Sequence, residues 1–470
     1  MLDDAFISFR YAANLVDGHG LVFNVGERVE GYTNFLWVIF LAFGKWLGFD
    51  IPALARGLGY FFSLATLGSI VVFGKTVFGL DRFGTATAIV MLGTCAVFSA
   101  WGGSGMEVSM LSFLILSSVG AYCIANAGKN QKLWYIVTGL TLSLVCMTRP
   151  DGVLLVFVLF GNGLFTLKGR KTSRAIWWMI LTFVTIFGSY FAWRYSYYGF
   201  LLPNTFYAKV GTTQAQLVRG LIYVGQFVWA VWPLLALAML AVLRQWRRLT
   251  SVVTLCVAYV VIQTVYVILV GGDIMPAFRF FAPILPLLVI LAGIGVNSIM
   301  VPRWIAAVVI VAVCGYNVLQ MYTSPQIAGH IERDRVAFEG KEVGLWLKAH
   351  VPPGTLIATN TAGSIPYYSE LPTIDMLGLN DVHIAHRQMP DMGTGDAGHE
   401  KTDGAYILSR HPLIIQFHSS LGSALPWNVS DRQVYSQPEF RELYEGVGVK
   451  IPSLDSVAVF CVRRDFRFKQ

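Results

Sequence analysis

The sequence predicts a polytopic α-helical membrane protein that carries a C-terminal α/β domain. Of its 470 residues, 55% are hydrophobic and 13% are charged, whereas a soluble domain carries about 25% charged residues. The mean hydropathy is +0.59. The apolar residues gather into runs of roughly 20, which is the length that an α-helix needs to cross the hydrocarbon of a bilayer. A soluble enzyme is therefore excluded.

The first 51 residues are expected to lie outside the bilayer. Asp3 and Asp4 open an amphipathic stretch, where negative charge is stabilised by a helix N-terminus. A helix cap explains these two acids, and a carboxylate base at the membrane surface is the functional alternative. The apolar run at 33–47 is short and contains Lys45. We expect an interfacial or re-entrant helix there rather than a crossing.

About ten membrane spans follow. Their order places Lys75 and Arg82, Lys129 and Lys132, the basic runs 168–174 and 244–248, and Arg303 in alternate loops. Excess lysine and arginine mark cytoplasmic loops, so we expect all of these clusters on the cytoplasmic side. The positive net charge of +8 is thereby explained without nucleic acid. The predicted spans are 52–75, 83–101, 107–126, 132–147, 152–167, 175–195, 219–243, 250–270, 279–300 and 304–321.

The tail beyond residue 321 has a different composition. It has mixed charges and seven of the eight histidines, with a predicted helix at 331–348 and a predicted strand at 355–359. We expect three units: an extracytoplasmic loop region (1–51) with interfacial helices, a transmembrane domain (52–321) and an extracytoplasmic α/β domain (322–470). His383 and His386 lack a third nearby ligand, so we predict no metal site for them.

Charged residues at the outer ends of the spans are the candidate functional groups. An acid such as Glu107 at the start of a span is costly unless it faces a cavity or a partner; a helix cap and structural ion pairs are the plain alternatives. Several such loops lie at the same membrane interface, and this favours a functional site over separate caps and ion pairs. Asp3 and Asp4 are the candidate base, and the candidate substrate-binding residues are Arg10, Glu27, Arg28, Glu30, Glu107, Arg149, Asp151, Asn204, Lys209, Asp273 and Arg279.

This set of side chains suits an anionic lipid headgroup. Arginine and lysine bind phosphate, aromatic side chains lie at headgroup depth and stack on sugar rings, and a carboxylate accepts a proton from a hydroxyl. The loop at 197–209 adds aromatic side chains, Asn204 and Lys209. The sequence therefore predicts that a lipid phosphate and a hydroxyl meet at the outer face of the membrane.

Several motifs, in order, resemble the GT-C superfamily of polyprenyl-phosphate-sugar-dependent glycosyltransferases. They are most similar to the mycobacterial terminal arabinofuranosyltransferases and their bacterial relatives. The resemblance covers residues 1 to about 290. The motifs are DDAFISFR (3–10), GHGLVFN (18–24) with GERVE (26–30), SGME (104–107), RPD (149–151), YG (198–199) with PN (203–204) and Lys209, and GD (272–273) with Met275 and Arg279.

The resemblance implies a glycosyltransferase of the bacterial inner membrane whose active site is extracytoplasmic. It would move a sugar, a furanose, from a polyprenyl phosphate donor to an acceptor hydroxyl on a cell-envelope glycan or glycoconjugate. The expected base is an aspartate of the first loop, with Asp3 favoured over Asp4. Lys209, Arg279 and Arg149 would steady the phosphate. No nucleotide cofactor is expected, and a divalent cation is left open.

Two alternatives remain at this stage. The donor sugar could be mannose or an aminoarabinose, since phosphate and base chemistry do not select the sugar. A lipid-linked glycan transporter or flippase is a second class, but it should place ionisable groups near the bilayer midplane and show related halves. The family also has a membrane helix immediately before the Asp-Asp loop. We therefore expect the chain to lack one preceding span of roughly 20 residues.

Overall fold

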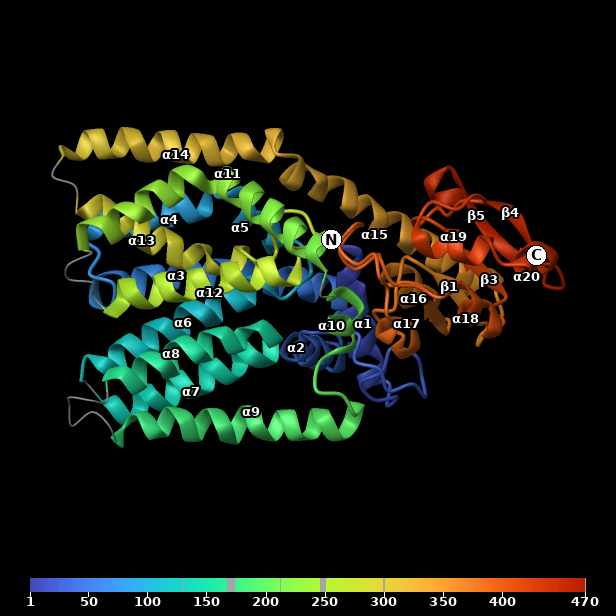
Figure 1. Ribbon diagram of the computed structural model, residues 1–470, viewed down its shortest axis with the longest axis horizontal. Helices are drawn as coiled ribbons and strands as arrows, with labels where there is room; N and C mark the ends of the chain where they lie inside the picture. Colours follow the sequence, from blue (N-terminus) through green and yellow to red (C-terminus); the bar gives the residue numbers. More distant parts are fainter. Residues whose placement is uncertain (129, 167–173, 212, 246–250, 299–300, 470) are drawn as a thin grey trace.

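The computed structural model describes residues 1–128, 130–166, 174–211, 213–245, 251–298 and 301–469. A bundle of long helices forms one part, and a smaller α/β domain lies at one end of it (Figure 1). The N-terminus lies where the two parts meet, and the C-terminus lies at the far end of the α/β domain. The chain therefore begins at the junction between the bundle and the domain.

Six helices of the described chain are long and apolar enough to cross a membrane. This confirms the predicted class of multi-pass membrane protein. Both α9 and α14 begin at the end of the bundle far from the α/β domain (Figure 1). The six are α3 (Ile51–Thr76), α6 (Val108–Asn126), α9 (Ile176–Tyr198), α11 (Gln214–Gln245), α12 (Ser251–Val270) and α14 (Arg303–Thr323).

Most of the other predicted spans are shorter or broken. The span expected at 83–101 is two helices, α4 (Arg82–Gly93) and α5 (Ala96–Gly102), bent by 65°. The helix ends at Gly93, a poor helix former. There the Thr94 hydroxyl bonds the Val90 carbonyl of the preceding turn, a bond that bends helices. The short ones are α8 (Val153–Thr166) and α13 (Leu285–Asn297), whereas α7 (Gln131–Thr148) has 18 residues and covers the predicted span 132–147.

Two short helices lie at the junction. These are α1 (Asp3–Val16) and α2 (Phe35–Trp46). With 12 residues, α2 is roughly 18 Å long, which is too short to cross a bilayer and agrees with the predicted interfacial helix. Lys45 of α2 pairs with Asp17 at the end of α1 at 2.7 Å. The two helices also pack on each other, and α2 packs against α3 and α7.

A long helix connects the bundle to the α/β domain. It is α15 (Pro325–His350), and it begins six residues before the predicted 331–348 because Pro325 occupies the first helical turn, where proline is well tolerated. The domain holds five short helices: α16 (Ser364–Ser369), α17 (Val382–His386), α18 (Gly404–Ser409), α19 (Val429–Tyr435) and α20 (Pro438–Leu443).

The domain is built on one five-stranded sheet with the order β2-β1-β3-β5-β4. The first three strands are parallel, and β5 pairs antiparallel with β3 and β4. β1 confirms the predicted strand but begins at Ile357. The strands are β1 (Ile357–Thr359), β2 (Thr373–Asp375), β3 (Ile414–Gln416), β4 (Tyr444–Ile451) and β5 (Ser456–Arg463).

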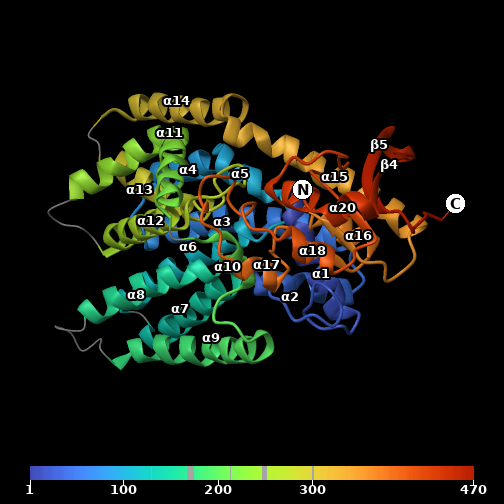
Figure 2. The same cartoon turned by 45° about the vertical axis from the view of Figure 1, so that its right-hand side comes forward.

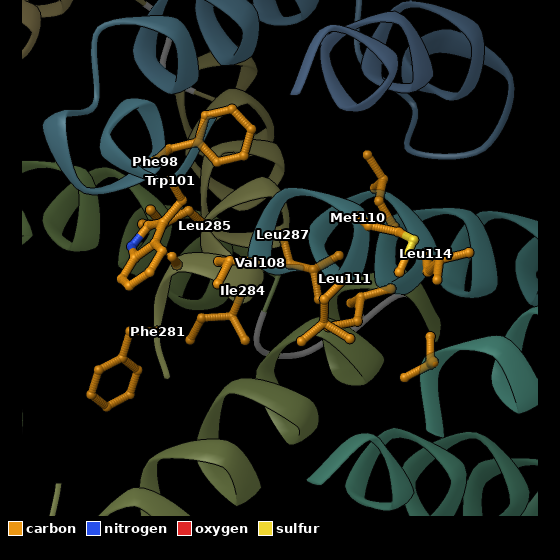
Figure 3. Close-up of a cluster of buried hydrophobic side chains, with 14 of the residues drawn as sticks. Phe98, Trp101, Val108, Met110, Leu111, Leu114, Phe281, Ile284, Leu285 and Leu287 are labelled. Atoms are coloured by element: carbon orange, nitrogen blue, oxygen red, sulfur yellow. The ribbon is translucent and has the colours of Figure 1, made fainter. Parts of the chain in front are cut away.

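A packed core supports the loops at the junction. Figure 3 shows Phe98 and Trp101 of α5 beside Val108 and Leu111 of α6, with Phe281 and Ile284 nearby. The Trp101 indole donates a hydrogen bond of 2.8 Å to the Ala277 carbonyl. This core therefore fixes the loop 271–281 relative to the start of α6.

Part of the basic runs, at 168–171 and 247–248, lies outside the described residues, as does Lys129.

Candidate active site

A cavity of about 130 Å³ opens at the junction end of the bundle. Charged side chains from five chain segments that are far apart in the sequence line it. Seven of the thirteen residues predicted from the sequence are among them. They are Asp4, Glu107, Arg149, Asp151, Lys209, Asp273 and Arg279.

Arg149 is the centre of one ionic network in the cavity. Its Nη1 lies 3.1 Å from Oε1 of Glu107, and its Nε lies 2.9 Å from Oδ1 of Asp151. The other Glu107 oxygen accepts a hydrogen bond of 2.8 Å from the Asn34 amide, which in turn accepts one of 3.0 Å from the Ser8 hydroxyl. Glu107, which could have been a helix cap, and Asp151 are thus both paired with Arg149. The network joins α1 to the residues at the starts of α2 and α6.

Arg279 is the centre of the second network. It donates two hydrogen bonds, of 2.7 and 3.0 Å, to the carboxylate of Asp273. The loop that carries both residues needs φ values of +53° and +48° at Ala277 and Phe278. Such strain in non-glycine residues persists where the surroundings hold it and is concentrated at functional sites. The predicted span 279–300 therefore starts late: Arg279 is in the loop, and α13 begins at Leu285.

Lys209 and Asp4 also line the cavity, but neither takes part in the hydrogen bonds of the two networks. Within the described chain, Lys209 makes no hydrogen bond or ion pair, and Asp4 accepts no hydrogen bond. The pKa of Lys209 is lowered by burial and then by the Arg279 charge, although Asp4 and Asp273 oppose this shift. One cation and one carboxylate in the same cavity are thus available to ligands.

Asp3 has a different environment from Asp4. Its carboxylate accepts hydrogen bonds from the backbone N–H groups of Gly363 and Ser364, at 3.0 and 2.8 Å, and from the Ser364 hydroxyl. It therefore caps α16 and ties the N-terminus to the α/β domain. Burial is the main cause that raises the pKa of Asp3 to about 6. Of the predicted pair, Asp4 faces the cavity with an uncommitted carboxylate.

The other predicted residues do not line this cavity; they fix the surrounding loops. Arg10 donates to the backbone carbonyls of Phe23 and Leu371 at 2.7 and 2.8 Å. Asn204 donates to the carbonyls of Gly378 and Leu379. As a result, α10 (Asn204–Lys209) packs on α17, and Figures 1 and 2 both show the two helices side by side.

The acids of the first loop bind arginines elsewhere in the chain. Glu30 pairs with Arg194 near the end of α9, with Nε to Oε1 at 2.8 Å. Glu27 pairs with Arg410 of the α/β domain at 3.1 Å. Arg28 lies over the ring of Tyr197, with its guanidinium carbon 4.7 Å from the ring centroid. These three residues therefore hold the loop against two other parts of the chain.

Two supporting residues were not predicted from the sequence. Arg194 is 4% exposed and also donates to the carbonyls of Phe200 and Leu201. An arginine in the last turns of an apolar span is itself a signal for a functional or structural partner. Asn34 gave no such signal, because a single amide before an apolar run is ordinary.

The C-terminal domain matches a family model, and a little under two thirds of the chain matches known proteins. Residues 326–462 match a family model described as a domain of unknown function, DUF8728. The chain is 27% identical over 342 residues to the terminal beta-(1->2)-arabinofuranosyltransferase of Mycobacterium tuberculosis, covering 64% of this chain and 53% of that protein. The enzyme of the same name from Corynebacterium glutamicum is 26% identical over 343 residues, covering 63% and 48%. The chain thus spans about half the length of these relatives.

Solved structures share the fold. The crystal structure of ArnT from Cupriavidus metallidurans bound to undecaprenyl phosphate aligns with a TM-score of 0.57 at 11% identity, over 79% of this chain and 81% of that one. The arabinofuranosyltransferase AftD from Mycobacteria aligns with a TM-score of 0.54 at 13% identity, over 98% and 38%. These findings confirm the resemblance found in the sequence: the chain is similar in sequence to the terminal arabinofuranosyltransferases and shares the fold of ArnT and AftD.

Proposed function

We propose that the protein transfers a sugar, arabinofuranose, from a polyprenyl phosphate donor to an acceptor hydroxyl of a cell-envelope glycan. The observation that carries this proposal is one cavity that holds the Lys209 ammonium and the Asp4 carboxylate, neither with a hydrogen bond in the described chain, beside the Arg279–Asp273 pair. A phosphate needs the cation, and an attacking hydroxyl needs the carboxylate. The arabinofuranosyltransferase relatives support the choice of sugar.

In the proposed reaction, Asp4 takes the proton of the acceptor hydroxyl. The hydroxyl oxygen forms a bond to the anomeric carbon of the sugar as the bond from that carbon to the phosphate oxygen breaks. The leaving polyprenyl phosphate keeps the electron pair, and the charge that develops on it is stabilised by Lys209 and Arg279. Arg149 is held by Glu107 and Asp151, so its role is to set the electrostatic potential of the cavity.

The proposed location is the bacterial inner membrane, with the cavity and the α/β domain on the extracytoplasmic side. Arg174 and Arg303 lie next to the ends of α9 and α14 that point away from the α/β domain, which fits the distribution of positive charge in cytoplasmic loops. The charged residues of the cavity gather at one end of the bundle rather than at its middle. This arrangement favours an interfacial enzyme over a transporter.

The test is a transfer assay with the full chain in proteoliposomes. A panel of polyprenyl-phosphate sugars, with arabinofuranose, mannose and aminoarabinose as head groups, is offered with a cell-envelope glycan acceptor. We expect product from the arabinofuranosyl donor and none after Asp4→Asn. Product from another head group alone would replace arabinofuranose as the donor sugar. Absence of product with every donor, or full activity of Asp4→Asn, would overturn the proposal.

A further inference from the structure

A second cavity, of about 310 Å³, adjoins the first one on the side of the α/β domain. Five residues line both cavities, and Asp4 and Lys209 are among them; the others are Ile7, Leu379 and Ala397. The Asp4 carboxylate therefore lies where the two cavities meet, and its charge contact is with Arg279 at 3.9 Å. A group that entered from the second cavity would reach the same carboxylate as a donor in the first.

The second cavity lies at the carboxyl ends of the parallel strands. Asn360 and Thr361 follow β1, and His418 and Ser419 follow β3; all four residues line the cavity. The chain passes from β1 to β2 on one side and then to β3 on the other side of β1. In open α/β sheets, ligands bind in the crevice outside the carboxyl ends of the strands at such a switch point.

One buried carboxylate holds this edge of the domain together. Asp431 has no exposed surface. It accepts hydrogen bonds from the backbone N–H groups of His418, Trp427 and Asn428, at 3.0, 3.1 and 3.0 Å, and from the Asn360 amide at 2.7 Å. Two separate loops, the one after β1 and the one between β3 and α19, are thereby fixed in one arrangement. A surface that is organised in this way binds a ligand with little loss of conformational entropy.

The face of the cavity that Asp431 organises is polar and aromatic, and the rest of the lining includes three acids and one lysine: Asp3, Asp4, Asp396 and Lys209. The His418 ring stacks on the Trp427 indole with centroids 4.6 Å apart and an angle of 20°, and Trp427 is 62% exposed. His418 has a φ of +64°, a conformation that costs energy in a non-glycine residue. Hydroxyl and amide groups of Thr361, Ser419 and Asn428 lie around the same cavity. This chemistry suits sugar hydroxyls and sugar ring faces.

We infer that this cavity is the acceptor subsite and that it binds the end of a neutral glycan chain, with the attacking hydroxyl directed to Asp4. The inference rests on the proposed function, because it names the acceptor of that reaction. The DUF8728 domain then selects the acceptor, while the membrane bundle binds the donor. Asp431 is a positioning residue, since it acts through the loops that it holds.

The kinetic test separates the acceptor from the donor. A neutral oligoarabinofuranoside and an arabinofuranosyl polyprenyl phosphate are titrated separately against the full chain in proteoliposomes. We expect His418→Asn and Trp427→Ala to raise the KM for the oligosaccharide by 10-fold or more and to leave the KM for the donor within 2-fold. Asparagine tolerates a positive φ, and Trp427 is exposed, so both variants should fold. Equal changes in both KM values, or none, would overturn the inference.

Leu425→Ala is the matched control, since Leu425 is 63% exposed in the same loop as Trp427. Neither residue lines the cavity itself, but Trp427 stacks on His418, which does. Calorimetric titration of the full chain in detergent with the neutral oligosaccharide, without donor, gives a readout that does not need catalysis. Binding that is lost in His418→Asn supports the subsite even if no donor is ever turned over. Equal binding by His418→Asn and the unmodified chain, or tighter binding of a uronic-acid oligosaccharide, would contradict it.

Discussion

Nη1 of Arg279 lies 3.9 Å from Oδ2 of Asp4, too far for a hydrogen bond, while its Nε and Nη2 bind Asp273. The guanidinium is therefore oriented by one acid and stays close to another without neutralising it by direct contact. An anionic phosphate can approach the same guanidinium, and the Asp4 carboxylate keeps free lone pairs for a proton. Asp273 thus orients the guanidinium, and Asp4 is left to accept a proton.

Asp4→Asn should lower kcat for sugar transfer by about 100-fold or more, the range lost when a general base is removed. The KM for the donor should change little, because the amide keeps the shape of the side chain. Steady-state kinetics with both substrates measure this. Asp17→Asn is the control, since Asp17 is a half-exposed acid at the other end of α1 that pairs with Lys45, and it should retain activity.

Lys209→Gln should weaken binding of polyprenyl phosphate about 10-fold to 100-fold, because a charge-assisted hydrogen bond is worth about 1.5–3 kcal/mol. Equilibrium binding of undecaprenyl phosphate to the detergent-solubilised chain measures this directly. Lys45→Gln removes a lysine from the same junction outside the cavity and should bind the lipid normally. A normal affinity for Lys209→Gln would remove this lysine from the phosphate site.

Glu30→Gln should lower the free energy of unfolding by about 3 kcal/mol, because it leaves Arg194 buried without its charge partner. Both side chains of this pair are 4% exposed. Glu27→Gln is the matched comparison, since its pair with Arg410 is about 40% exposed (37% and 42%) and an exposed pair is worth only about 0–1 kcal/mol. Denaturant unfolding in detergent should separate the two variants; equal losses would contradict the assignment.

The contact between Asp3 and α16 should be sensitive to pH. The folded-state pKa of Asp3 is about 6, above its ordinary value of 3.8, so the folded chain binds this proton more tightly than the unfolded chain. The contribution of Asp3 to stability is thus present below about pH 3.8 and is lost as the pH rises through 6. Unfolding measured from pH 4 to 7 should show a fall with rising pH that is absent in Asp3→Asn. Parallel pH profiles of the two proteins would contradict this.

The sequence determined the membrane class and the groups of the site because both depend on local signals. Runs of apolar residues mark spans wherever they occur, and charged residues such as Glu107 and Arg279 at the ends of such runs are costly enough to predict a partner. The prediction that the run 33–47 does not cross the membrane followed from its short length and from Lys45. Those predictions needed no knowledge of how the helices pack.

Tertiary structure alone decided which of these charges are free. The sequence could not distinguish Asp3 from Asp4, because adjacent residues of a helix point in different directions and their partners, Ser364 for one and Arg279 for the other, lie hundreds of residues away. The late start of the helix in the predicted span 279–300 also follows from long-range packing, such as the Trp101–Ala277 hydrogen bond. The second cavity exists only because the sheet edge of the α/β domain is placed against α1.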